Sequence, residues 1–83
     1  NVSTYPNPSQ GNSVISVDLK EAGTLSIVVM NVLGEVVYTH NSQELSDNSY
    51  LIPIDLSNNA SGIYYANVSV NGHVQSVKIN LAK

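Results

Sequence analysis

The side chains of this sequence that could carry acid–base or metal chemistry are six carboxylates and two histidines. The carboxylates are Asp18, Glu21, Glu35, Glu44, Asp47 and Asp55. A catalytic acid and base require a second titratable group nearby, and none of the six has one at a diagnostic spacing. His40 and His73 are far apart in the chain, with no cysteine or acidic cluster that would complete a zinc site. We therefore expect solvated surface charges, with no catalytic residue, no metal site and no cofactor.

Two other motifs could bind a ligand. Residues 55–59, Asp-Leu-Ser-Asn-Asn, are rich in oxygen ligands, but they lack the alternating acids and the closing Glu of a calcium loop. An Asx-type turn before the next strand is the favoured interpretation. Tyr50, Tyr64 and Tyr65 could stack on a sugar ring, as aromatic residues do in carbohydrate-binding modules. In a chain without Phe or Trp, tyrosines packed in the core explain them better.

The composition favours one folded β domain and excludes several classes of partner. The chain has 83 residues, of which 42% are apolar and 11% charged, which is enough apolar material for a single core. Three cationic residues against six acidic ones give a net charge of −3. Nucleic-acid binding is not expected, because it depends on many basic contacts to phosphates. No apolar run approaches the roughly 20 residues of a transmembrane span.

Turn signals divide the chain into segments in which apolar and polar residues alternate, as they do in half-buried strands. Such segments are residues 14–19, 50–56, 62–70 and 73–81. Asn71-Gly72 between the last two predicts a tight hairpin. With a short strand at residues 2–5, the pattern predicts an all-β, immunoglobulin-like antiparallel β-sandwich of about seven strands.

One segment has apolar residues on both faces. Leu25, Ile27 and Val29 form one face, and Val28 and Met30 lie on the other. This pattern predicts a central strand that is covered on both sides.

The segments that follow it are less regular. A turn at Gly34 predicts an antiparallel hairpin in which Val36 and Tyr38 are the core pair. Residues 40–49 are polar without a period, so we expect a loop or a poorly formed edge. Pro53 cannot donate a hydrogen bond to a neighbouring strand, which places its segment at a sheet edge or a bulge.

Five motifs occur in an order that resembles a known family. They are Tyr5-Pro6-Asn7-Pro8 followed by Gly11 and Asn12, the run Val29 to Val37 around Gly34, Asp55-Leu56-Ser57, Ser61-Gly62-Ile63-Tyr64-Tyr65, and Val77 to Lys83. Together they resemble the type A C-terminal sorting domain of the Bacteroidetes type IX secretion system, also called the Por system.

The resemblance implies a sorting signal rather than an enzyme. The expected partners are the type IX translocon, a surface sortase that removes the domain and anchors the cargo, and an N-terminal cargo domain in the same chain. Residues 1–83 would form one C-terminal sorting domain, whose residues 1–4 could be the end of a linker from the cargo. The implied location is the periplasm in transit, and then the cell surface or the extracellular space.

The resemblance also assigns roles to residues. The recognition candidates are Gly62, Tyr64, Lys78, Ile79, Asn80, Leu81, Ala82 and Lys83. The other motif residues are expected to be structural: Tyr5, Pro6, Asn7, Pro8, Gly11, Gly34 and Asp55. Gly62 and Tyr64 could equally be a turn glycine and a core ring. One mechanism for this recognition is that the partner pairs with the exposed edge of the last strand.

The main alternative is an immunoglobulin-like spacer or carbohydrate-binding module that stays on the mature protein, since a fold alone does not assign a function. A hydrolase is a distant third, because no catalytic constellation is present in the sequence.

Overall fold

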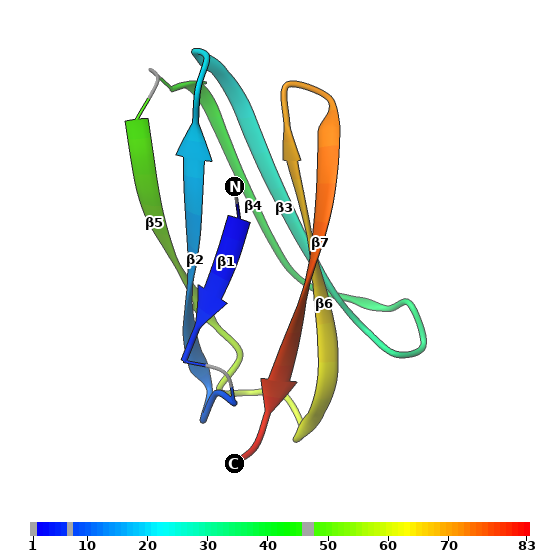
Figure 1. Ribbon diagram of the computed structural model, residues 1–83. Helices are drawn as coiled ribbons and strands as arrows, with labels where there is room; N and C mark the ends of the chain where they lie inside the picture. Colours follow the sequence, from blue (N-terminus) through cyan, green and yellow to red (C-terminus); the bar gives the residue numbers. More distant parts are fainter. Residues whose placement is uncertain (1, 7, 46–47) are drawn as a thin grey trace.

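The computed structural model describes residues 2–6, 8–45 and 48–83, which form seven antiparallel strands in two sheets (Figure 1). The smaller sheet has the order β1-β2-β5, with β1 at Val2–Tyr5, β2 at Asn12–Leu19 and β5 at Asn48–Asp55. The larger has the order β4-β3-β6-β7, with β3 at Gly23–Asn31, β4 at Val36–Leu45, β6 at Gly62–Val70 and β7 at His73–Leu81. The predicted all-β sandwich is confirmed.

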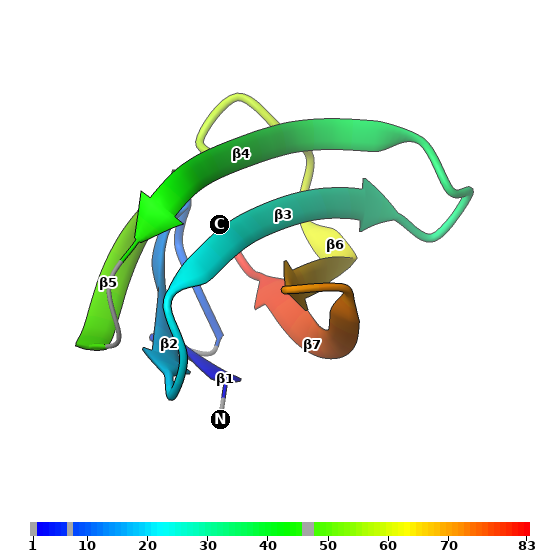
Figure 2. The same cartoon turned by 90° about the horizontal axis from the view of Figure 1, so that it is seen from above.

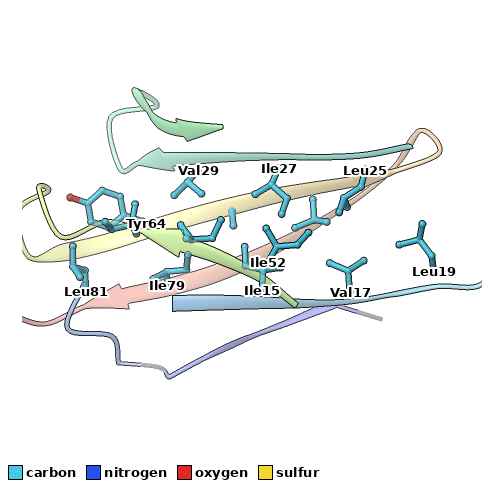
Figure 3. Close-up of a cluster of buried hydrophobic side chains, with 14 residues drawn as sticks. Ile15, Val17, Leu19, Leu25, Ile27, Val29, Ile52, Tyr64, Ile79 and Leu81 are labelled. Atoms are coloured by element: carbon cyan, nitrogen blue, oxygen red, sulfur yellow. The ribbon is translucent and has the colours of Figure 1, made fainter. Parts of the chain in front are cut away.

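The core lies between the two sheets, where every second side chain of the strands points inward (Figure 3). The buried apolar residues are Ile15, Val17, Leu19, Leu25, Ile27, Val29, Ile52, Ile54, Leu56, Tyr64, Ala66, Val68, Ile79 and Leu81. Each Val, Leu or Ile among them contributes about 1.5–3 kcal/mol when it leaves water. A slip of one residue in any strand would turn its apolar set toward solvent, so the alternation fixes the register.

The β6–β7 hairpin has the tight turn that the Asn-Gly pair predicts. Asn71 and Gly72 have φ angles of +50° and +87°, as the central residues of a type I′ turn require. The Asn71 side chain also accepts a hydrogen bond from the Thr24 N–H at 2.9 Å. A Cβ atom at Gly23 would lie 1.7 Å from the Asn71 Oδ1, so only glycine leaves room for this contact. The β6–β7 and β2–β3 turns are therefore joined at one end of the sandwich.

Strand β3 is central, but the prediction that both of its faces are covered is wrong. It pairs with β4 on one side and β6 on the other, and its residues Leu25, Ile27 and Val29 are buried. Val28 and Met30 are only half-buried, since they lie on the outer face of the larger sheet. Their apolar character therefore belongs to an outer surface.

Strand β4 agrees with one of the two sequence alternatives for its polar end. Residues 40–45 continue the strand at the edge of the larger sheet, and β5 begins at Asn48, so the predicted edge is confirmed and the loop is not. The edge position tolerates a polar sequence because only one side of the strand is paired. A register shift places Val37 as an extra residue opposite β3. Val37 and Tyr38 therefore both pack against the core, whereas Val36, expected in the core, is 56% exposed.

Strand β5 lies at an edge, as Pro53 predicts. Pro53 is opposite Val14 of β2. The Leu56 N–H donates to the Gly11 C=O at 2.7 Å, which makes that pair and every second pair along β2 and β5 the hydrogen-bonded ones. The Pro53 nitrogen therefore faces away from β2.

Candidate recognition site

Motifs from the two ends of the chain meet at the lower end of the sandwich in Figure 1, where the C-terminus lies. Between β1 and β2, the part of the chain around Ser9 runs beside the end of β7. Tyr5, the last residue of β1, is 47% exposed, and the Tyr5–Pro6 peptide is cis. Pro6 and Pro8 are exposed, and Asn7 lies outside the described residues. The segment leaves the smaller sheet, contacts the larger one and returns.

Ser9 connects the two sheets through its backbone. Its N–H donates to the Asn80 C=O at 2.8 Å, and its C=O accepts from the Ala82 N–H at 2.7 Å. These bonds form an isolated parallel bridge between Ser9 and Leu81. The last residues of the chain are thus bound on both sides, by β6 and by the segment that carries the Tyr-Pro-Asn-Pro motif.

The conformation around Ser9 is fixed by its side chain and by Gly11. The Ser9 hydroxyl, which is fully buried, accepts from the Gly11 N–H at 3.1 Å and donates to the Asn12 C=O at 3.2 Å. Gly11 has a φ of +137°, and a Cβ atom there would lie 3.2 Å from the Cα of Ser57. The absence of a side chain at Gly11 thus lets its backbone approach the turn after β5 closely.

The turn after β5 carries an electrostatic contact to the C-terminus. The Ser57 N–H donates to the Asp55 Oδ1 at 2.9 Å, which is the predicted Asx-type turn. The Lys83 ammonium donates to the Ser57 C=O, and the Lys83 N–H donates to the Ser61 hydroxyl at 3.1 Å. Hydrogen bonds from the Ser57 hydroxyl and N–H, with the nearby Lys83 charge, lower the pKa of Asp55 below its ordinary value of 3.8.

Replacing Asp55 with asparagine is expected to make the stability of the fold less sensitive to acid. A lowered pKa in the folded state means that the ionised carboxylate stabilises the fold above pH 3.8. This contribution is lost as the pH falls through the lowered pKa. Thermal unfolding of both proteins between about pH 5 and pH 2 measures the difference. The exposed Glu21→Gln is the control, and parallel profiles for Asp55→Asn and the parent would contradict the assignment.

Gly62 and Tyr64 lie at the start of β6, next to this end of the sandwich. Tyr64 is a core ring that is 6% exposed, and its hydroxyl donates to the Ala60 C=O at 2.6 Å. Gly62 is exposed, has a φ of +155° and is opposite Leu81 in the register. Tyr65 points to the opposite face of the sheet from Tyr64, so the two rings do not form one stacking platform.

The remaining candidates on the terminal segment divide by face. Ile79 and Leu81 are buried in the core. Lys78, Asn80, Ala82 and Lys83 are exposed. The accessible part of the candidate site is therefore the outer face of the end of β7 and the two residues that follow it.

The open edge of β7 is shorter than the sequence suggests. This strand is an edge of the larger sheet. In a hairpin with a two-residue turn, Val70 and His73 form a hydrogen-bonded pair, so the backbone groups of even-numbered β7 residues point away from β6. Ser9 already uses the Asn80 C=O and the Ala82 N–H. Edge pairing by a partner would thus begin N-terminal to Asn80, nearer to Val74 and Ser76.

Sequence reasoning missed Ser9, which holds this site together. The prolines and the glycine near it predict turns because of their backbone preferences, whereas a serine in a polar segment carries no periodic signal. The separation of Ser9 from Asn80 and Ala82 along the chain also gives no local indication of the contact. The one indication in the sequence is the short spacing between Pro8 and Gly11, which predicts a turn around Ser9.

A comparison with protein families bears on this arrangement. A family model described as a secretion system C-terminal sorting domain matches residues 3–81. The match includes both the segment around Ser9 and the last strand, which meet in the fold. The chain belongs to this sorting-domain family. No curated protein matches the sequence.

Membership of the type IX sorting-domain family gives the general function. Such a domain is a sorting signal for type IX secretion, follows a cargo region, and directs export to the cell surface or the extracellular space. Within the described residues, no helix is long and apolar enough to cross a membrane. No group of three or more His, Cys, Asp or Glu side chains in the described ranges could hold a metal ion.

Proposed function

We propose that the type IX translocon recognises the folded end of this sorting domain, where the terminal segment lies against the segment that carries Ser9. Recognition is followed by removal of the domain by a surface sortase, which anchors the cargo. The domain crosses the periplasm before recognition and catalyses nothing itself.

One observation carries this proposal. The Ala82 N–H donates to the Ser9 C=O, so two sequence motifs that are far apart in the chain form one surface. The exposed groups of that surface are Lys78, Asn80, Ala82 and Lys83. A partner that binds there would contact the terminal residues only in the geometry that the folded sandwich imposes.

A reporter fusion tests the function. Residues 1–83 are placed behind a signal peptide and a fluorescent protein and expressed in a bacterium with type IX secretion. We expect fluorescence at the surface or in the medium, and its loss in a translocon mutant. Retention of the reporter in the periplasm of the parent strain would contradict the proposal.

The same fusion tests the site and the removal step. Lys83→Ala is expected to reduce export, because Lys83 lies in the proposed recognition site. Lys20→Ala is the matched control, since Lys20 is also exposed but lies at the other end of the sandwich, and it should not change export. After export the reporter should be smaller by about the 8.9 kDa of the domain. A reporter that reaches the surface at its full mass would instead support an immunoglobulin-like spacer or binding module that is retained.

A further inference from the structure

The β3–β4 hairpin presents an apolar tip to solvent. Four of the seven large apolar residues that are exposed in the described part of the chain lie on this hairpin or directly beside it. They are Val32 at 69%, Leu33 at 81%, Val36 at 56% and Tyr65 at 41%. The hairpin extends beyond the rest of the sandwich in both ribbon views (Figures 1 and 2). We call Val32, Leu33 and Val36 the apolar tip.

The apolar tip is held in one conformation by Asn31. The Asn31 Oδ1 accepts from the N–H groups of Leu33 at 2.9 Å and Glu35 at 3.0 Å, and its amide donates to the Glu35 carboxylate at 2.9 Å. The Asn31 backbone closes the turn with bonds to Glu35 and to Gly34, both at 3.0 Å. A partner would therefore meet a turn whose backbone is already fixed, which lowers the entropic cost of binding.

The fold does not account for apolar side chains at these positions. The turn needs the backbone freedom of Gly34, whose φ is +85°, and the side chain of Asn31. Val32 and Leu33 project away from the core cluster and are not part of it. Polar residues would satisfy the same turn and would be better solvated, since turn positions usually carry them. Exposed apolar side chains on a rigid projection are instead typical of an interaction site.

The apolar tip continues into a stripe across the outer face of the larger sheet. Val36 is opposite Met30, Met30 is opposite Tyr65, and Tyr65 is opposite Lys78. Side chains at directly opposed positions lie on the same face and within contact distance of one another. The stripe therefore runs from the hairpin to β7, where the candidate recognition site begins.

We infer that the apolar tip is a second docking element, which inserts into an apolar pocket on a protein of the export machinery. This inference rests on the proposed function and extends it from the chain terminus to the hairpin. A protein pocket is favoured over a lipid surface by charge. Residues 31–42 contain Glu35 and no Lys or Arg, whereas peripheral membrane binding generally adds basic residues to apolar ones.

The test compares apolar residues of similar exposure in the reporter fusion. The variant Val32→Ser with Leu33→Ser should reduce surface fluorescence about tenfold or more, because burying two aliphatic side chains contributes more than one decade of affinity. The conservative single variant Leu33→Met, in which Val32 is retained, should be exported at the level of the parent. The control Leu51→Ser, at 63% exposure on β5, should leave export unchanged.

Each other outcome overturns the inference. Export of the double variant at the parent level shows that the tip has no role in export, and an equal loss for Leu51→Ser shows a general effect of surface polarity. Cosedimentation of the purified fusion with phosphatidylethanolamine–phosphatidylglycerol vesicles, abolished by the double variant, assigns the tip to lipid. Dimerisation that depends on Leu33 assigns it to a second copy of the chain. If the parent fusion itself is retained, the proposed function fails and this inference fails with it.

The variants are expected to fold, so the readout stays interpretable. Exposed side chains contribute little burial, and surface substitutions usually change stability by less than about 0.5 kcal/mol, a factor of about two in the folding equilibrium. Thermal unfolding of the purified fusions checks this. If the double variant is unstable, the single variant Leu33→Asn replaces it, with the same expected loss of export and the same contradicting result.

Discussion

Replacing Leu81 with alanine is expected to lower the free energy of unfolding by about 2–5 kcal/mol. Leu81 is 1% exposed and is the last buried side chain of β7. Its removal leaves a cavity between the sheets, and the neighbouring backbone cannot collapse into it because Ser9 and β6 fix it from both sides. Urea denaturation followed by circular dichroism measures the change. For a domain of this size, each kcal/mol corresponds to roughly 4–8 °C in Tm.

Val74→Ala on the same strand is the matched control. Val74 is 64% exposed, so its truncation should change the unfolding free energy by less than about 0.5 kcal/mol. Similar losses for Leu81→Ala and Val74→Ala would contradict the position of β7 in the sandwich. Deletion of residues 80–83 mixes this core effect with recognition, because it removes Leu81 and both bonds to Ser9. Lys83→Ala separates the two.

The second large effect is expected at Ser9. Changing it to alanine removes the acceptor for the Gly11 N–H and the donor to the Asn12 C=O in a fully buried position. A buried backbone group left without its partner costs about 1–3 kcal/mol. We expect a loss of that size in the unfolding free energy, with a corresponding fall in Tm measured by thermal unfolding.

Ser13 provides a control of the same residue type and burial. It is 1% exposed, and its hydroxyl has no hydrogen-bond partner within the described residues. Ser13→Ala removes a buried polar group that makes no bond, so it should be neutral or should stabilise the fold by up to about 1 kcal/mol. If Ser13→Ala destabilises the domain as much as Ser9→Ala, the hydrogen bonds assigned to Ser9 do not explain its effect.

Much of the fold follows from period-two alternation. The inward faces of β2, β5, β6 and β7 were predictable because apolar residues recur there at every second position. The Asn71-Gly72 turn was predictable because few residue pairs accept two positive φ angles. Pro53 indicated an edge because it lacks an N–H.

The errors arose where alternation fails. Strand β4 has an extra residue at Val37, so the inward positions change along the strand and Val36 lies outside. Its polar end looks like a loop in sequence because an edge strand needs no apolar face to keep its backbone bonds to β3. Met30 was placed in a covered layer, although its neighbours on the outer face only half-bury it.

The candidate site was predictable in part. Sequence motifs identified the terminal residues, but alternation alone could not show that the backbone of Asn80 and Ala82 is bound to Ser9. That contact joins residues distant in the chain, and hydrogen bonds of the backbone do not depend on side-chain type. The position of Lys83 beside Asp55 and Ser57 was hidden for the same reason.

The tie between Ser9 and the last residues also has a consequence for the order of synthesis. Because synthesis runs from the N-terminus, the ribosome completes β7 after the other six strands of the domain. Ile79 and Leu81 are needed to fill the core, and Ser9 remains without its two backbone partners until Asn80 and Ala82 arrive. A cargo chain that ends early cannot close the sandwich. A cargo chain truncated within β7 would therefore carry an unfolded sorting domain.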